Sequence, residues 1–184
     1  MVNLSMDLEY LDKYEQAVGQ AIRTYLLSHG AVDDMMPDAP DIEDKWQSIA
    51  ESYLPDGVRE FNGYPMVSLG WMMFIGMAIA KLWDEDWETY SSKPDLYASI
   101  RDVRGYDCMD EYICEEILKV GEEMQAVSKL VGDTAQIAHR ALMREGFESG
   151  TPMAFHAYTR TLHQLYIYGY AVQLKRMGYH MTKM

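Results

Sequence analysis

Residues 66–80, MVSLGWMMFIGMAIA, carry no charged side chain, although the formal net charge of the whole chain is −13. A helix that is apolar on every side lies either in a protein core or in a membrane. At about 1.5 Å per residue this stretch would be roughly 22 Å long, short of the ~30 Å hydrocarbon layer of a bilayer. Three acidic residues directly follow Trp83. We therefore predict a buried central helix over about residues 65–90, and no membrane span.

Small residues in this stretch predict how its neighbours pack. Gly76 and Ala80 are four residues apart and therefore share one face of the helix. Because neither carries a large side chain, a second helix is expected to approach closely at that face. The bulky side chains expected to be almost fully buried are Trp71, Phe74, Ile75 and Ile79.

The rest of the 184-residue chain is typical of one all-α domain. Its length fits a single domain over residues 1–184. Leu, Met, Ala, Tyr and Glu are common, and no segment alternates apolar and polar residues with the period of a strand. Six or seven helices with short connections favour an antiparallel helical bundle around the central helix.

Caps, stops and apolar stripes indicate the helix boundaries. Residues 55–57 (PDG) are expected to end the second helix with a turn. Thr151 is expected to cap the last helix and Pro152 to open it. Residues 132–134 (GDT) either break or only weaken the helical pattern, so residues 107–146 form one helix or two. The expected helices are residues 4–29, 41–54, 65–90, 94–104, 107–131, 135–145 and 152–177.

The start of the chain and its cysteines bear on the compartment. The first residues, MVNLSMDLEYLD, are acidic where a signal peptide is basic. Cys108 and Cys114 lie six residues apart on one expected helix, point to different faces and cannot form a disulfide with each other. Because free thiols are typical of a reducing compartment, we expect a cytoplasmic protein.

Charge is distributed unevenly along the chain. Residues 149–184 contain four Lys or Arg and no Asp or Glu, whereas the preceding residues are strongly acidic. The last helix therefore either packs against acidic neighbours and balances their charge, or lines an anion site. Nucleic-acid binding is disfavoured, because a net charge of −13 repels phosphates.

Sequence motifs for metal, cofactor or catalytic chemistry are absent. The chain has no Glu-x-x-His pair of the di-iron type, and no CxxC, HExxH, GxSxG or P-loop pattern. His156 and His163 lie roughly 10 Å apart along a helix, which is too far to share one ion. We expect no metal and no cofactor, and the missing motifs favour a protein that is not an enzyme.

The first candidate site is the acidic, tryptophan-containing run at the end of the central helix. Acidic residues there oppose the helix dipole, each at a cost of up to about 1 kcal/mol, which suggests a compensating partner. The functional interpretation is a surface for a basic partner. The structural alternative is that Arg101, Arg104 or the basic last helix pairs with these acids. The candidate partner-binding residues are Trp83, Asp84, Asp86, Trp87 and Glu88.

The second candidate site combines histidines and arginines of the last two helical segments. Histidines that titrate near neutral pH beside arginines suit an anion pocket or a general-base site. The structural alternative is that each histidine is an ordinary hydrogen-bonded side chain. The candidate ligand-binding residues are His139, Arg140, Arg144, His156, Arg160 and His163.

These two sites give two hypotheses of function. The leading one is a protein that acts by protein–protein contact, with an acidic surface for a basic partner; 15 methionines and 14 tyrosines suit such contact, including contact between copies of this chain. The alternative is a small-anion-binding protein or enzyme that uses the His/Arg cluster. Convergence of these histidines and arginines on one cleft would favour the alternative, and their separation on a convex surface would favour the first.

Overall fold

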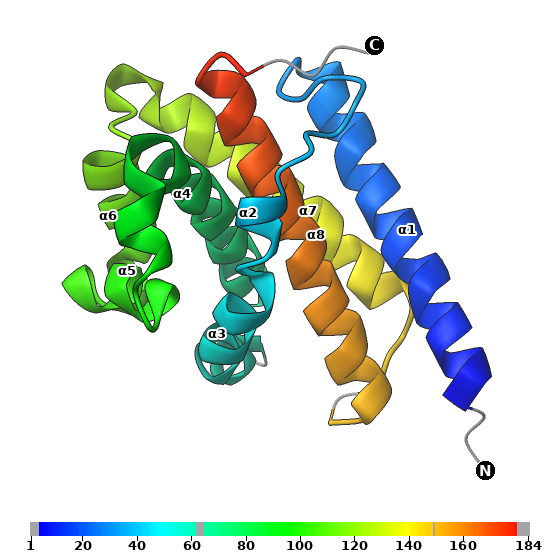
Figure 1. Cartoon of the computed structure of the whole chain (residues 1–184). Coiled ribbons are helices and arrows are strands. Elements are labelled where there is room, and N and C mark those ends of the chain that lie inside the picture. Colours follow the sequence, from blue (N-terminus) through cyan, green and yellow to red (C-terminus); the bar gives the residue numbers. More distant parts are fainter. Residues whose placement is uncertain (1–3, 62–64, 149, 180–184) are drawn as a thin grey trace.

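α4 (Pro65–Ser91) lies at the centre of the structure, a computed structural model that describes residues 4–61, 65–148 and 150–179 (Figure 1). It packs most extensively against α8 (Pro152–Arg176). The other helices are α1 (Leu4–Ser28), α2 (Pro40–Glu43), α3 (Trp46–Phe61), α5 (Leu96–Arg104), α6 (Met109–Tyr112) and α7 (Met124–Arg144), with the short turns η1 (Tyr106–Cys108), η2 (Ile113–Ile117) and η3 (Gly121–Glu123). The described residues contain no strand, so the all-α class and the bundle around a central helix are confirmed.

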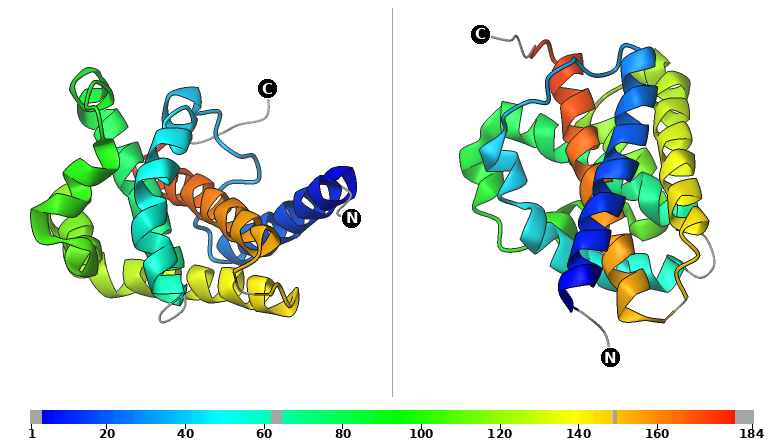
Figure 2. Two further views of the ribbon diagram at one scale, coloured as in Figure 1. Left: turned by 90° about the horizontal axis from the view of Figure 1, so that it is seen from below. Right: turned by 90° about the vertical axis from the view of Figure 1, so that its right-hand side faces the viewer.

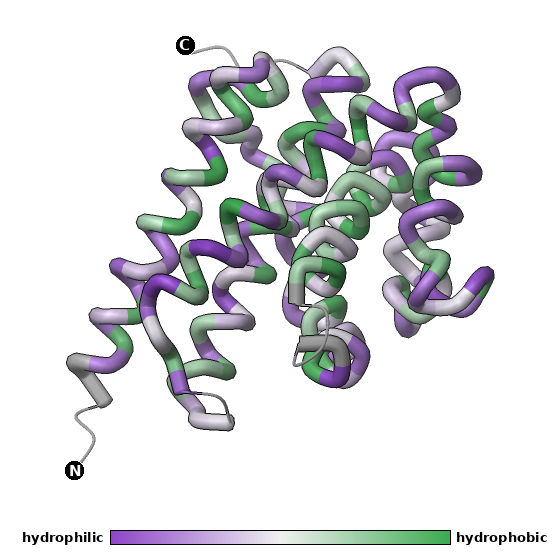
Figure 3. Tube along the Cα trace, turned by 180° about the vertical axis from the view of Figure 1, so that it is seen from behind, coloured by the Kyte–Doolittle hydropathy of each residue, from purple (hydrophilic) through white to green (hydrophobic). Residues whose placement is uncertain are grey.

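The remaining helices cover α4 and α8 from two sides. α1 packs against α7 and α8 on one side, whereas α5 and α6 lie against α4 on the other (Figures 1 and 2). Polar and apolar residues are mixed along each turn of α1 and α7, as expected of helices with one buried face (Figure 3). The first turns of α4 are predominantly apolar in the same view. α4 is therefore the inner helix of the bundle.

Two glycines allow α4 and α8 to touch along their backbones. A Cβ atom on Gly76 would clash with the carbonyl oxygen of Tyr166, and a Cβ atom on Gly169 would clash with that of Met73. That second Cβ would also lie 3.2 Å from the Cα atom of Gly76. The close approach expected at Gly76 is confirmed, and its partner on α8 is a second glycine.

The expected core of α4 is confirmed with one exception. Phe74 is 4% exposed, and Ile75 and Ile79 are completely buried. Trp71 is only partly buried, so its expected burial is wrong. Its indole N–H donates to the carbonyl oxygen of Tyr106 at 2.7 Å, which places the ring at the margin of the core.

α4 is also the one helix of the described residues that is long and apolar enough to cross a bilayer. Most of its apolar part is buried inside the protein. Burial against other helices is the alternative to lipid for an apolar helix. The structure thus supports a core helix, and the absence of a membrane span stays a prediction.

α3 runs through residues 55–57, so the turn expected there is wrong. Pro55 removes one backbone hydrogen bond from the helix. Contacts from α5 hold the segment in place: the Tyr97 hydroxyl donates to Asp56 at 2.7 Å, and Arg101 pairs with the same carboxylate at 3.0 Å. These tertiary contacts outweigh the local turn propensity.

Residues 107–146 form two helical units, and the break between them lies at residues 118–120, directly before η3. Lys119 in this break has φ +53°, and Gly121 at its end has φ +56°. This left-handed conformation commonly ends a helix. α7 runs through residues 132–134, where an exposed glycine weakens a helix by only about 1 kcal/mol. The helix break considered at residues 132–134 therefore lies earlier in the chain, before η3.

Local caps fix the boundaries of the last helix and of α5. The Thr151 hydroxyl accepts a hydrogen bond from the Ala154 amide at 3.2 Å, and Pro152 is the first residue of α8, so the expected start is confirmed. Asp95 caps α5 by accepting from the Ala98 amide at 3.0 Å. Each side chain satisfies one amide that the helix start leaves unpaired.

Candidate functional site

The basic side chains of α8 form ion pairs, starting with Arg160. Its guanidinium pairs with Asp12 and lies 3.3 Å from a carboxylate oxygen of Glu15, both on α1. The amide group of Gln164, one turn further along α8, donates to the other oxygen of Glu15 at 2.6 Å. Arg160 thus joins α8 to α1, and two carboxylates neutralise its charge.

His163 lies between two carboxylates. Its Nε2 atom is hydrogen-bonded to Glu43 of α2, and its Nδ1 atom lies 3.9 Å from Glu15 of α1. The imidazole stacks on the indole ring of Trp46, with 4.6 Å between centroids and 5° between planes. The Tyr170 hydroxyl donates to the second oxygen of Glu43 at 3.1 Å. His163 therefore links α8 to three other parts of the fold.

The other two described Lys and Arg side chains of α8 are paired as well. Lys175 lies 3.1 Å from Asp33, and Arg176 lies 2.7 Å from Glu123. The last helix therefore packs against acidic neighbours that balance its charge. Of the two interpretations of the uneven charge, this one is confirmed by the ion pairs.

The structure groups four of the six candidate ligand-binding residues, in two separate pairs. Arg160 and His163 both approach Glu15, as described above. Arg140 and Arg144 line a groove of about 190 Å³ between α1 and α7. His139 is partly buried on α7, and His156 is exposed at the start of α8, where its ring meets that of Phe155. Among the described residues no contact joins these four to Arg160 or His163, and their role in ligand binding stays a prediction.

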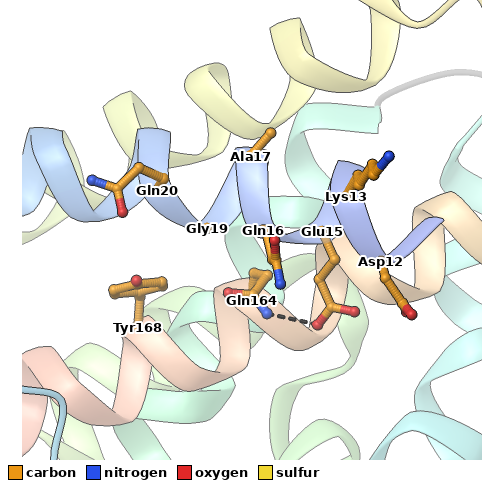
Figure 4. Close-up of a pocket in the computed structure, with 9 residues that line it drawn as sticks. All are labelled: Asp12, Lys13, Glu15, Gln16, Ala17, Gly19, Gln20, Gln164 and Tyr168. Carbon is orange, nitrogen blue, oxygen red and sulfur yellow. Dashed lines mark hydrogen bonds between the residues drawn. The ribbon is translucent and has the colours of Figure 1, made fainter. Parts of the chain in front are cut away.

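A larger groove follows the seam between α1 and α8, with a volume of about 910 Å³ (Figure 4). Gln164 and Tyr168 rise from α8 toward Glu15 and Gly19 on α1. The charged side chains that line it are Asp12, Lys13 and Glu15. Asp12 and Glu15 pair with Arg160, and Lys13 lies 3.3 Å from Glu9. The groove therefore offers amide and hydroxyl groups but no unpaired cation for an anion.

The acidic run at the end of α4 contains a second, short helical segment. The backbone of α4 leaves the helical conformation at Asp86, whose carboxylate accepts from the Thr89 amide at 3.3 Å. Asp86 thus acts as an N-terminal cap, a position that favours an acidic side chain. The expected conflict with the helix dipole is removed at this residue, because a new helix start lies where a helix end was expected.

The cations expected to pair with this run bind elsewhere. Arg101 pairs with Asp56, and Arg104 lies 2.7 Å from Glu115. Lys81 instead pairs with an acid of the run, 3.6 Å from Glu85. The expected contact with a cation exists, but the expected arginines do not make it, because α5 directs them toward α3 and η2.

The two tryptophans of the run anchor it to neighbouring segments. The Trp83 indole N–H donates to Asp41 at 3.3 Å, and its ring meets that of Tyr179 edge-on. The Tyr179 hydroxyl donates to Asp84. The ammonium group of Lys45 lies 5.8 Å from the ring centre of Trp87. Both tryptophans are partly buried, with acidic side chains beside them.

Sequence reasoning missed a buried tyrosine network where α3, α4 and α8 meet. The hydroxyl of Tyr53 donates to the carbonyl oxygen of Ser68, and that of Tyr158 donates to the Ser68 hydroxyl at 2.9 Å. Complete burial raises the pKa of Tyr53 well above its ordinary value. Sequence reasoning also missed Glu15 and Glu43 as partners of α8. Both are acids on polar helix faces, and nothing in the neighbouring sequence indicates that they face another helix.

The structure shows no metal centre in the residues it describes. No group of three or more His, Cys, Asp or Glu side chains is arranged there to hold a metal ion. Cys108 and Cys114 are both free, as expected. Burial raises the pKa of the Cys114 thiol to about 12, which keeps it protonated and unreactive at neutral pH.

Comparison of the chain with protein-family models, curated proteins and solved structures found no match. The function therefore rests on the contacts described above.

Proposed function

We propose that this protein acts by binding a basic protein partner through the acidic surface at the C-terminal end of α4. This α4 acidic surface consists of Asp41, Trp83, Asp84, Asp86, Trp87 and Glu88. Its acidic members are all exposed, and the partner would supply lysine or arginine side chains.

The observation that carries the proposal is that three acids of this surface have no cation paired with them. Asp84, Asp86 and Glu88 form no ion pair with any residue that the structure describes. The cations of α8 pair with other carboxylates, and those of α5 do so as well. A basic partner would therefore meet carboxylates that no cation of the described fold occupies, and opposite charge speeds association.

The tryptophans supply what charge alone does not. Trp83 and Trp87 are partly buried and are fixed by contacts with Asp41 and Lys45. Tryptophan is enriched among the residues that dominate binding energy, and its ring face attracts arginine and lysine. An aromatic pair among acids suits a basic partner better than an acidic one.

The pairing of α8 also favours this proposal over anion binding. An anion at Arg160 or His163 would compete with Asp12, Glu15 and Glu43, which already contact these two side chains. Displacing Glu15 or Glu43 would leave a partly buried carboxylate unpaired, which is costly.

The test compares two triple variants with the same change of charge. Asp84→Asn/Asp86→Asn/Glu88→Gln neutralises the α4 acidic surface and keeps a capping side chain at position 86. Glu111→Gln/Glu122→Gln/Glu148→Gln neutralises three exposed acids elsewhere. Isothermal titration with a synthetic arginine- and leucine-rich peptide measures the affinity of each.

We expect the first variant to bind the peptide roughly tenfold more weakly than wild type, since three exposed ion pairs at about 0.5 kcal/mol each sum to ~1.5 kcal/mol. The second variant should lose far less. Equal losses in the two variants would show that net charge alone attracts the peptide, and the proposed surface would be rejected.

A further inference from the structure

A third groove, of about 210 Å³, lies between the first turns of α4 and the middle of α7. Trp71 and Phe74 of α4 contribute aromatic rings to its lining, and Val131 of α7 contributes a methyl surface. Asp110 of α6 is the one ionisable side chain among its lining residues. This groove and the α4 acidic surface occupy opposite ends of α4, so the two sites are independent.

Glycines keep the groove open. A Cβ atom on Gly132 would have no neighbouring atom within 4 Å, so the space above this residue is empty. A Cβ atom on Gly70 would lie 3.7 Å from the side chains of Val131 and Ala135, which is ordinary contact distance. The groove floor therefore follows the helix backbones and could be filled by a side chain placed at position 132.

Asp110 is a partly buried carboxylate without a cation. It forms no ion pair with any described residue, and burial raises its pKa above the ordinary value of 3.8. The nearby acid Glu111 acts in the same direction. The backbone amides of Asp110 and Glu111 donate to this carboxylate, but no cation balances its charge, and burying an unbalanced carboxylate is unfavourable. A positively charged group in the groove would remove that cost.

The ring of Trp71 gives the groove a second preference for cations. Its N–H is bound to the carbonyl oxygen of Tyr106, and its ring meets that of Phe74 at 6.1 Å and 73°. Both contacts hold the indole in one orientation. A fixed indole offers a face that attracts an ammonium group and an edge that packs on a flat ring.

We infer that this groove binds a small primary amine with an aromatic body, its ammonium group on Asp110 and its ring along Trp71 and the open space at Gly132. The proposed ligand is a free amine and not a lysine side chain of a protein. Its aromatic and methyl lining matches a flat ring, whereas a lysine stem would leave the rings only partly covered.

Titration with 2-phenylethylamine, followed by NMR at the indole N–H of Trp71, tests this inference. Asp110→Asn removes the charge with almost no change of shape, and Asp107→Asn is the matched control at an exposed acid outside the groove. We expect Asp110→Asn to weaken binding about tenfold or more, as for loss of a charged hydrogen bond, and Asp107→Asn to leave it unchanged.

Gly132→Phe provides an independent variant, because Gly132 lines the groove, a Cβ atom there would have no neighbour within 4 Å, and a larger ring could then occupy the groove. It should also weaken binding by about tenfold or more, while thermal melting reports that the variant is folded. Three further probes separate the contributions: 2-phenylethanol lacks the charge, 3-phenylpropionate reverses it, and Nα-acetyl-lysine methylamide stands for a protein lysine. Each should bind more weakly than 2-phenylethylamine.

The inference is overturned if 2-phenylethylamine produces no saturable shift up to about 10 mM, or if Asp110→Asn binds it as well as wild type. Binding of the alcohol or the acid as tight as that of the amine would also overturn it. Equal or tighter binding of the lysine derivative would reject a free amine as the occupant.

Discussion

Gly76 and Gly169 set the distance between the two central helices, and this makes them the most sensitive glycines of the core. A Cβ atom on either one would meet backbone of the facing helix, which cannot rotate away as a side chain can. Gly76→Ala or Gly169→Ala should therefore lower the free energy of unfolding by about 1–3 kcal/mol or more. Gly132→Ala is the control: its Cβ meets nothing, and alanine should raise the stability of α7 by up to about 1 kcal/mol. Urea denaturation measures all three, and equal effects would contradict the glycine contact.

Asp110 should give the protein a pH-dependent instability. Because burial raises its pKa in the folded state, the folded protein holds this proton more tightly than the unfolded chain does. The stability contributed by the proton is fully present below the unfolded pKa of 3.8 and is lost as the pH rises through the folded pKa. Asp110→Asn should therefore be more stable than wild type at pH 7, and this gain should vanish at acid pH.

Thermal melts of Asp110→Asn and of the exposed control Asp107→Asn across this pH range check the sign. A gain that stays constant with pH, or that appears equally in Asp107→Asn, would show that the charge of Asp110 is not the cause.

α2 is a helix of one turn, too short to be stable alone, and α8 holds it in place. The Tyr166 hydroxyl donates to the buried carbonyl oxygen of Ile42 at 2.6 Å. Tyr166→Phe should leave that oxygen unpaired, lower the free energy of unfolding by about 1–3 kcal/mol and speed hydrogen exchange at the Glu43 and Asp44 amides, which close this turn.

Tyr168→Phe is the matched control for this prediction. Tyr168 is also buried on α8, but its hydroxyl forms no hydrogen bond with a described residue. This substitution should leave both the stability and the exchange rates nearly unchanged. Equal exchange in the two variants would mean that other contacts hold α2.

Helix ends that depend on residues nearby in the sequence were predictable from the sequence. Thr151 and Pro152 start α8 through a local hydrogen bond, and the apolar run of α4 required burial. The end of α3 was not predictable, because Asp56 contacts side chains that are distant in the sequence. Tyr97 is 41 residues away and Arg101 is 45 residues away. Turn propensity is a local signal, and these contacts exist only once α5 has packed.

The candidate site divides in the same way. The sequence identified Arg160 and His163, since both lie on the titratable stripe of the last helix. Their partners came from far along the chain: Glu43 is 120 residues from His163, and Glu15 lies on α1. The sequence of α8 is the same whether or not acids of α1 and α2 pack against it. It therefore cannot distinguish an unpaired cluster of basic side chains from a paired one.

The distribution of charge across the whole protein follows from this pairing. Each described Lys or Arg of α8 is matched by an acid from α1, η3 or the segment between α1 and α3. The remaining excess of acid is therefore not compensated inside the fold, and part of it lies at the C-terminal end of α4. An acidic chain with paired internal cations keeps its negative field for a partner, which is the physical basis of the proposed function.

Stability of the whole bundle should depend on α4 more than on any peripheral helix, because α4 packs against helices on both sides. Ile75 is completely buried at its centre. Ile75→Ala should lower the free energy of unfolding by about 2–5 kcal/mol, through lost burial and the cavity left behind. Val103→Ala, at a side chain that is 56% exposed on α5, should change it by less than about 0.5 kcal/mol. Urea denaturation in aqueous buffer without detergent measures both variants. A loss below about 0.5 kcal/mol for Ile75→Ala would place this face of α4 against lipid or a second copy of the chain instead of in the core.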